Sequence, residues 1–254
     1  MHNAYVTLLS SEDYIDAVLV LAASLNKVRS RFPLLVAIVE DIYNEELDYL
    51  LKEFGCDIEV VPRLQYSTEV QNTCAGKSVL NTASKIQIFD FKRFDKLVYI
   101  DADSLVLENI DELFDWPDGS MMFYDGDETG SSNLFVITPK FHHESIYYIH
   151  LMEHFDVFDG NLFGDFWFHV LESPYHRIPR RFGYHYNPET RVPDNIKAIH
   201  YCNNPKPWLE PNAKEYSNLY PFARIYKLHL QDTLNFKAKI LKKYKTKYSL
   251  DKSV

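Results

Sequence analysis

Residues 96–107 read KLVYIDADSLVL, a short apolar run that leads directly into two aspartates, Asp101 and Asp103. An apolar run of this length, without polar alternation, is typical of a strand that is covered on both faces of a sheet. Upstream, the sequence predicts strands at 5–9, 34–39 and 57–61 and helices at 12–31, 44–54 and 79–91. Because strands alternate with helices, we expect an α/β fold: a Rossmann-like, mostly parallel central sheet with helices on both faces, and 96–100 at its centre.

The second half of the chain is less regular. It predicts strands at 120–124, 134–138 and 197–201, helices at 139–155 and 162–171, and a helical tail at 217–250, whereas 65–78 has the polar composition of a loop. No repeat or interdomain linker interrupts the chain. We therefore expect one domain over residues 1–210, and a basic helical extension over 211–254 that packs on the domain or trails from it.

The position of Asp101 and Asp103 matters more than their spacing. A D-x-D pattern arises by chance once or twice in a chain with this many aspartates, and Asp125-Gly126-Asp127 is a second example. In parallel α/β sheets, ligands bind beyond the carboxyl ends of the strands, where Asp101 follows its strand directly. We therefore favour a metal or substrate role for this pair over a solvated turn.

Glycine is scarce, and this limits how the protein can bind phosphate. Eight glycines in 254 residues are less than half of the roughly 7% found on average. Neither a dinucleotide-binding fingerprint nor a P-loop motif occurs. If the protein binds a nucleotide, groups other than a glycine-rich loop must bind the phosphates.

Charge is unevenly distributed along the chain, whose formal net charge is −9. Residues 224–252 hold nine Lys and Arg and two acids, so the rest of the chain carries −16. An acidic body disfavours nucleic-acid binding and suits a divalent cation. The basic tail could dock on an anionic membrane, bind a partner or form a lysine-rich helix, and its aromatic residues favour a helix partly packed on the domain.

The cysteines indicate a reducing compartment. Cys56, Cys74 and Cys202 are odd in number and widely spaced, which is neither a disulfide framework nor a zinc-binding pattern. The N-terminus lacks the features of a signal peptide, and no apolar run approaches the roughly 20 residues of a membrane span. We therefore expect a cytoplasmic protein without a transmembrane segment.

Four blocks of sequence occur in a recognisable order. They are TLLSSEDYIDAVLVLAASL (7–25), SKIQIFDFKRFDKLVYIDADSLVLENIDELFD (84–115), SNLFVITP (132–139) with FDGNLFGD (158–165), and HYCNNPKPW (200–208). Together they resemble the glycogenin-like branch of glycosyltransferase family 8, the retaining nucleotide-sugar transferases of GT-A fold. The resemblance implies that Asp101, Asp103 and His200 hold Mn²⁺, or Mg²⁺ in its place, and that Lys206 contacts the diphosphate of a UDP-sugar.

The same resemblance implies roles for further residues. Those that would bind the donor are Leu8, Ser10, Ser11, Tyr14, Lys85, Ala102 and Asn133. Lys77 is a further donor-binding candidate by its position, since it lies in the loop expected over the pocket, where it could close on phosphate or be a solvated loop lysine. Within this set the first strand-to-helix turn would hold uracil and ribose, with Tyr14 stacked on the base. Asp165 would lie on the reaction face, as nucleophile, stabiliser or acceptor-orienting group. Lys85 and Asp125 would lie near the donor sugar, so we count them with Asp165 as catalytic candidates.

Departures from the family pattern leave the substrate open. A family glutamine is replaced by Phe166, and family glycines are replaced by Asn133 and Asn203. We expect a Mn²⁺-dependent retaining glycosyltransferase that transfers glucose, galactose or N-acetylglucosamine from a UDP-sugar to a glycan or protein acceptor, and homodimers are common in this family. The alternative is a catalytically weak relative that serves as a nucleotide-sugar-binding or glycan-binding module.

Overall fold

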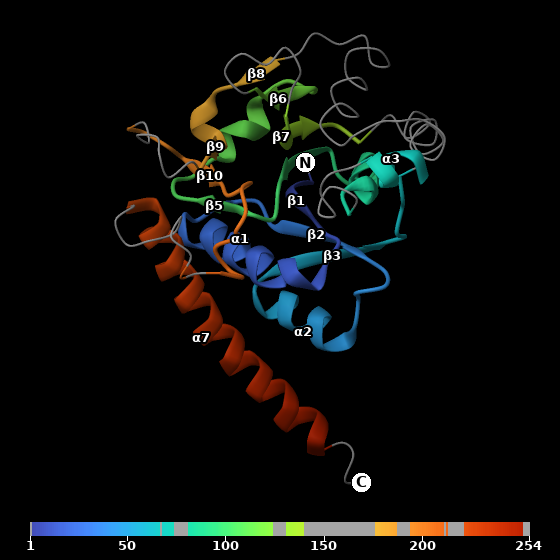
Figure 1. Ribbon diagram of the computed structural model, residues 1–254, viewed down its shortest axis with the longest axis vertical. Helices are drawn as coiled ribbons and strands as arrows, with labels where there is room; N and C mark the ends of the chain where they lie inside the picture. Colours follow the sequence, from blue (N-terminus) through green and yellow to red (C-terminus); the bar gives the residue numbers. More distant parts are fainter. Residues whose placement is uncertain are drawn as a thin grey trace.

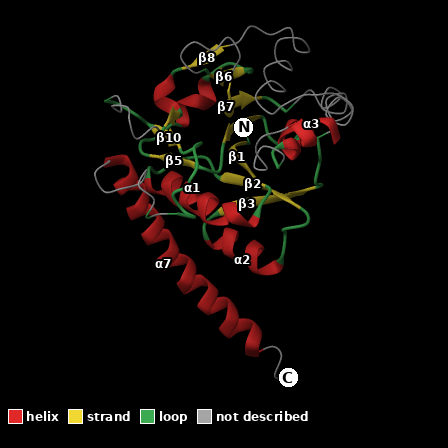
Figure 2. Ribbon diagram, viewed as in Figure 1, coloured by secondary structure: helices red, strands yellow, loops and turns green. Residues whose placement is uncertain are grey.

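The computed structural model describes residues 2–66, 68–73, 81–123, 131–139, 176–186, 194–210, 212 and 221–250. Within these residues, a seven-stranded sheet has the order β3-β2-β1-β4-β7-β6-β8 (Figure 1, Figure 2). Its strands are β1 (Asn3–Leu9), β2 (Leu34–Val39), β3 (Cys56–Val61), β4 (Lys96–Ile100), β6 (Ser120–Met122), β7 (Ser131–Ile137) and β8 (His176–Ile178). A smaller sheet, in the order β5-β10-β9, contains β5 (Ser104–Val106), β9 (Tyr184–His185) and β10 (Ala198–His200).

The large sheet is mostly parallel, as the sequence predicts. Strand β1 pairs in parallel with β2 and with β4, and β2 pairs in parallel with β3. Strand β6 pairs in parallel with β8, while β7 is antiparallel to both β4 and β6. Strand β4 has the predicted bounds and stands in the middle of the order. The carboxyl end of β4, and with it Asp101, therefore lies at the centre of one edge of the sheet.

Each face of the sheet packs against its own layer. Helices α1 (Ile15–Lys27) and α2 (Glu45–Glu53) cover one face, and the alternate side chains of β1 and β2 pack on the other face against a 3-10 helix, η2 (Ala83–Asp90). Asn44 caps α2 by accepting a hydrogen bond from the Leu47 amide, and Gly55 follows the helix with a φ of 78°, a left-handed conformation that favours glycine.

Two local predictions need correction. Residues 79–91 do not form an α-helix where they are described, because η2 is a 3-10 helix. The side chains of Ser84 and Gln87 both donate hydrogen bonds to the Pro62 carbonyl, and these buried polar contacts favour the tighter turns. Residues 65–78 are not all loop, since α3 (Thr68–Thr73) lies within them. The helices expected at 139–155 and 162–171 fall almost wholly outside the described residues.

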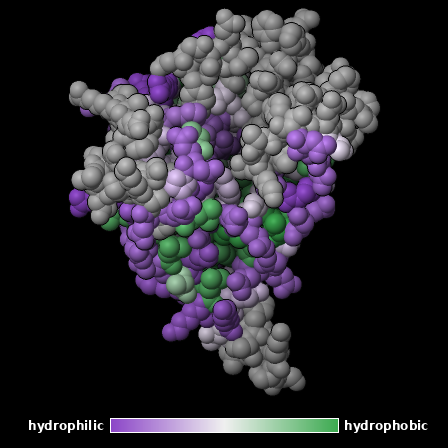
Figure 3. Space-filling view, in the orientation of Figure 1, coloured by the Kyte–Doolittle hydropathy of each residue, from purple (hydrophilic) through white to green (hydrophobic). Residues whose placement is uncertain are grey.

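The basic tail forms a long helix, α7 (Pro221–Leu250), that packs against α1 and α2 and then extends past them (Figure 1). Tyr226 and Ile240 are buried, and Lys237 Nζ lies 2.6 Å from Asp16 Oδ1. Apolar side chains are visible among hydrophilic ones on the lower half of the face in Figure 3, where these helices meet. No helix among the described residues combines the length and the apolar character needed to cross a membrane.

The buried carboxylate of Asp111 connects three segments of the chain by hydrogen bonds. Asp111, in the 3-10 helix η3 (Asp111–Asp115), accepts hydrogen bonds from Tyr5 Oη, Ser30 Oγ, the Arg31 amide and Asn109 Nδ2 at 2.8–3.1 Å. Burial alone would raise the pKa of Asp111, but these hydrogen bonds hold it below its ordinary value.

We expect Asp111→Asn to lower the free energy of unfolding by about 2 kcal/mol at neutral pH, because an amide NH₂ would face buried donors. Since folding depresses the pKa of Asp111, its contribution is complete above the unfolded value of about 3.9 and is lost as the pH falls through the folded value. Urea unfolding at pH 7 and pH 3 measures both effects. The exposed Asp115→Asn is the matched control; an equal effect in both variants would contradict the assignment.

Candidate active site

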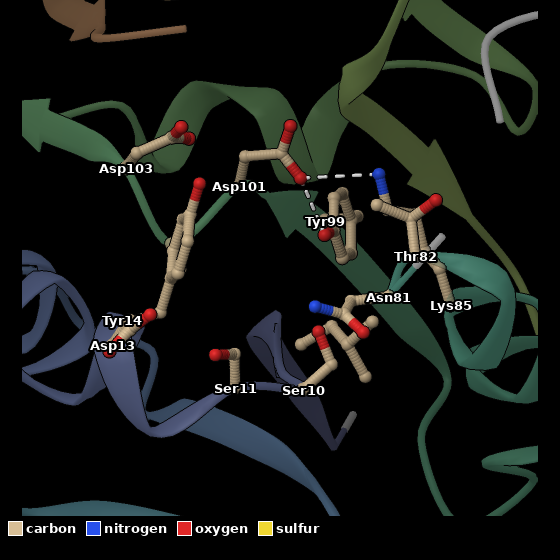
Figure 4. A pocket seen from close by; sticks show the side chains of 12 residues that line it. Ser10, Ser11, Asp13, Tyr14, Asn81, Thr82, Lys85, Tyr99, Asp101 and Asp103 are labelled. Atoms are coloured by element: carbon tan, nitrogen blue, oxygen red, sulfur yellow. Dashed lines mark hydrogen bonds and ion pairs between the residues drawn. The ribbon is translucent and has the colours of Figure 1, made fainter. Parts of the chain in front are cut away.

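A cavity of about 250 Å³ opens at the carboxyl ends of β1 and β4 (Figure 4). It is lined by Leu8, Ser10, Ser11, Asp13, Tyr14, Asn81, Thr82, Lys85, Tyr99, Asp101, Ala102 and Asp103. The two serines come from the turn after β1, and the aspartates from the turn after β4 on the opposite wall. This is the edge of the sheet at which the parallel topology predicts a ligand.

Trp208, from the segment after β10, packs against Tyr14. The rings of Tyr14 and Trp208 meet edge to face with centroids 5.1 Å apart, and Trp208 Nε1 donates a 2.7 Å hydrogen bond to the Asp13 carbonyl. Burial, followed by the negative charge of Asp103, raises the pKa of Tyr14 to about 12, so its phenol stays protonated at neutral pH. The segment after β10 therefore packs against the turn after β1.

Asp101, Asp103 and His200 converge from two strands. Their ligand atoms lie within 4.8 Å of one another, and His200 Nε2 is 3.0 Å from Asp103 Oδ1 and 3.6 Å from Asp101 Oδ2. The antiparallel pairing of β5 with β10 brings them together, because it sets His200 opposite Ser104. Burial would raise the pKa of Asp103, but His200 and Lys206 hold it well below its ordinary value.

Two buried lysines flank this group. Lys206 Nζ lies 2.7 Å from Asp103 Oδ2 and also donates to the carbonyls of Tyr201 and Cys202. Burial lowers the pKa of Lys206, but Asp103 raises it more, so the ammonium stays charged. On the other side, Lys85 Nζ lies 3.2 Å from Asp101 Oδ1, which also accepts a 2.6 Å hydrogen bond from Tyr99.

The structure brings together most of the residues that the sequence predicts. Leu8, Ser10, Ser11, Tyr14, Lys85 and Ala102 line the cavity with the two aspartates, and His200 and Lys206 contact Asp103 behind them. Asn133 is buried on β7 and does not line the cavity, although its carbonyl accepts a hydrogen bond from the Asp101 amide. Lys77, Asp125 and Asp165 lie outside the described residues.

Sequence reasoning missed four residues of the cavity wall: Asp13, Asn81, Thr82 and Tyr99. Asp13 follows the two serines of the first strand-to-helix turn. Asn81 and Thr82 lie just before the SKIQ block, from which Ala83 separates them, and Tyr99 alternates with Val98 on the face of β4 opposite the α1 layer. Strand alternation was thus the available signal for Tyr99, but it does not reveal that the ring reaches the cavity.

The side chains suit a hard divalent ion. Carboxylate oxygens with one imidazole are ligands that Mn²⁺ and Mg²⁺ accept. In an octahedral site with bonds of about 2.1 Å, neighbouring ligand atoms lie about 3 Å apart. The distances of 3.0 and 3.6 Å from His200 Nε2 to the two carboxylates are close to that spacing. Asp101, Asp103 and His200 therefore fit such an ion with only small movements.

Known structures share this fold. The crystal structure of galactosyltransferase LgtC with donor and acceptor sugar analogues superposes with a TM-score of 0.59 at 13% identity, over 90% of this chain and 95% of that one. The glycosyltransferase GlyE of Streptococcus pneumoniae TIGR4 gives 0.59 at 16% identity, over 91% and 63%. The fold is therefore the GT-A fold of glycosyltransferases, and the predicted fold class is confirmed.

Sequence relatives define the family. The model for glycosyl transferase family 8 matches residues 5–147, so the chain belongs to that family, and the predicted membership and enzyme class are confirmed. Galactinol synthase 1 of Ajuga reptans is 43% identical over 119 residues, which are 46% of this chain and 35% of that relative. Galactinol synthase 1 of Solanum lycopersicum is 29% identical over 277 residues, which cover 92% and 84%. Several of the first relatives are thus matched over about a third of their length.

We expect Asp103→Asn to lower the free energy of unfolding by about 3–5 kcal/mol in metal-free buffer, because Lys206 would stay buried without its counter-charge. The double variant Asp103→Asn/Lys206→Met should recover much of this loss. Urea unfolding of both single variants and the double variant in EDTA gives the coupling between the two side chains. Additive losses would show that the two charges do not stabilise each other.

Proposed function

We propose that this protein transfers a hexosyl group from a UDP-sugar, with retention of anomeric configuration, using Mn²⁺ or Mg²⁺ held by Asp101, Asp103 and His200. One observation carries the proposal. Asp101 and Asp103 at the end of β4 meet His200 and Lys206, about a hundred residues later, at the wall of a cavity in a family 8 glycosyltransferase. Such a set of groups suits a nucleoside diphosphate, and it needs no glycine-rich loop.

The charges around the cavity support binding of a nucleoside diphosphate. Lys206 and Lys85 are buried cations at either end of the aspartate pair, where they would attract the diphosphate and counter the charge that grows on it as the sugar leaves. The bound ion would act there as a Lewis acid for the leaving group. Leu8, Ser10, Ser11 and Tyr14, on the opposite wall, would hold uracil and ribose.

The remaining parts of the proposal rest on the family resemblance. Asp165 is the group proposed for the reaction face, Asp125 and Asn133 are proposed near the donor sugar, and Lys77 near the phosphates. We further propose a catalytic domain over 1–210 with a basic extension over 211–254, a cytoplasmic setting, and a homodimer. A glycan or protein would accept the sugar.

The names of the relatives favour galactose as the donor sugar. Both sequence relatives named above are galactinol synthases, and one structural neighbour is a galactosyltransferase. We therefore place UDP-galactose before UDP-glucose and UDP-N-acetylglucosamine, and add galactinol to the products to be sought.

The test is release of UDP from a panel of UDP-sugars. We expect release that requires Mn²⁺ or Mg²⁺, stops in EDTA, and falls by about 100-fold or more in Asp101→Asn, because loss of an ion ligand weakens charge stabilisation by several kcal/mol. Asp48→Asn is the matched control, since Asp48 pairs only with surface groups among the described contacts, Lys52 and Tyr43. Mass spectrometry of the protein, and chromatography for galactinol when inositol is added as an acceptor, identify the acceptor.

Two results would contradict the proposal. Metal-independent release, or unchanged metal-dependent release in Asp101→Asn, would remove the assigned ion site. Binding of UDP-sugars without release or transfer across the panel would favour the alternative of a nucleotide-sugar-binding module.

A further inference from the structure

A second group of metal-binding side chains lies beside the first. Strand β10 pairs in parallel with β9, and the register sets His200 next to His185. Cys202 follows His200 by two residues, just past the end of β10. The ligand atoms of His185, His200 and Cys202 lie within 4.8 Å of one another. This trio differs from the aspartate site in chemistry, because it offers sulfur and nitrogen instead of oxygen.

His200 belongs to both groups, and its two ring nitrogens differ. Nε2 is next to the aspartates, at 3.0 Å from Asp103. Nδ1 is buried and has no hydrogen-bond partner, although the residue is only 6% exposed. A buried polar atom without a partner is uncommon and calls for a ligand or a water. Nδ1 is therefore the atom of His200 that is available for a second ion.

We propose that His185, His200 and Cys202 form a binding site for Zn²⁺, with the fourth coordination position open to water or another ligand. Zn²⁺ binds imidazole nitrogen and thiolate sulfur at about 2.0–2.3 Å in tetrahedral sites, and catalytic sites use three such protein ligands. In a tetrahedron of that size the ligand atoms lie about 3.3–3.6 Å apart. The trio reaches this spacing through movements of about 1 Å. The Cys202 thiol gives its proton to water as the sulfur–zinc bond forms.

The position of the trio suits the entry of an ion. Cys202, two residues past the end of β10, is partly buried and partly exposed to solvent. His185 is also only partly buried, opposite His200 in the β9–β10 pairing.

Occupation of this site would couple to the ion proposed at the aspartates. A neutral imidazole has one lone pair, so Zn²⁺ on Nδ1 would leave the ring proton on Nε2 and take His200 away from the aspartate site. Zn²⁺ should therefore weaken binding of Mn²⁺, and Mn²⁺ should weaken binding of Zn²⁺ by the same factor. This coupling rests on the proposed function, whereas the zinc site itself does not.

Co²⁺ tests the site without reference to activity. Titration of the metal-free full-length protein with Co²⁺ should produce a thiolate-to-cobalt absorption band that Zn²⁺ displaces. Cys202→Ser should lose the band and bind Zn²⁺ at least about tenfold more weakly, the least that loss of even an outer-shell partner costs. His185→Gln should weaken Zn²⁺ binding similarly. The control is Cys56→Ala/Cys74→Ala, which leaves Cys202 as the sole cysteine and should keep the band.

Asp101→Asn separates this inference from the proposed function, because it should keep the band while losing Mn²⁺. A missing band in the unsubstituted protein, or a band that persists in Cys202→Ser, would overturn the zinc site. Free Mn²⁺, followed by electron paramagnetic resonance, should rise on addition of Zn²⁺ in the unsubstituted protein and not in Cys202→Ser. A normal band in a protein that binds no Mn²⁺ would support the zinc site and contradict the proposed function.

Discussion

Asp103 is a carboxylate that is 7% exposed, and the arrangement of the site depends on its charge. A buried carboxylate is stable only with close partners, and Asp103 has His200 at 3.0 Å and Lys206 at 2.7 Å. Both partners come from residues 200–206, a hundred positions further along the chain. These ionic contacts therefore hold residues 200–206 against the turn after β4, at the centre of the sheet. Trp208 continues the contact by donating a hydrogen bond to Asp13, in the turn after β1. A single electrostatic requirement thus joins three distant parts of the sequence.

Much of this arrangement could be predicted from local patterns. The bounds of β2 and β4 are as predicted, because continuous apolar runs that end at turn residues leave little freedom in their assignment. The carboxyl end of β4 then locates Asp101 and Asp103 by the topology of parallel sheets alone. The contacts of His200 and Lys206 could not be predicted in this way. Nothing within HYCNNPKPW indicates that these side chains contact Asp103, and only the family resemblance connects this segment with the aspartates.

The misassigned segments show where local patterns cease to be informative. Residues 83–89 are buried almost throughout, so they carry no amphipathic period, and side-chain bonds to Pro62 select a 3-10 helix over an α-helix. Tyr99 was recognised as a strand residue but not as part of the cavity, because its role depends on a hydrogen bond to the following turn. In both cases tertiary contacts of polar side chains decide the local structure or the place of the side chain, and helix and strand propensities carry no information on such contacts.

The group formed by His185, His200 and Cys202 also depends on tertiary contacts that local patterns do not reveal. Counting cysteines along the sequence gave no metal pattern, because the ligand spacings of zinc sites are recognisable only when the ligands share one turn or hairpin. Here His185 meets His200 through the pairing of β9 with β10, and Cys202 joins them from just past the end of β10. The short sheet β5-β10-β9 thus brings the oxygen ligands of the turn before β5 close to the nitrogen ligands of β9 and β10 and the sulfur just after β10. Since His200 stands between these two sets, its orientation is the variable through which either ion would influence the other.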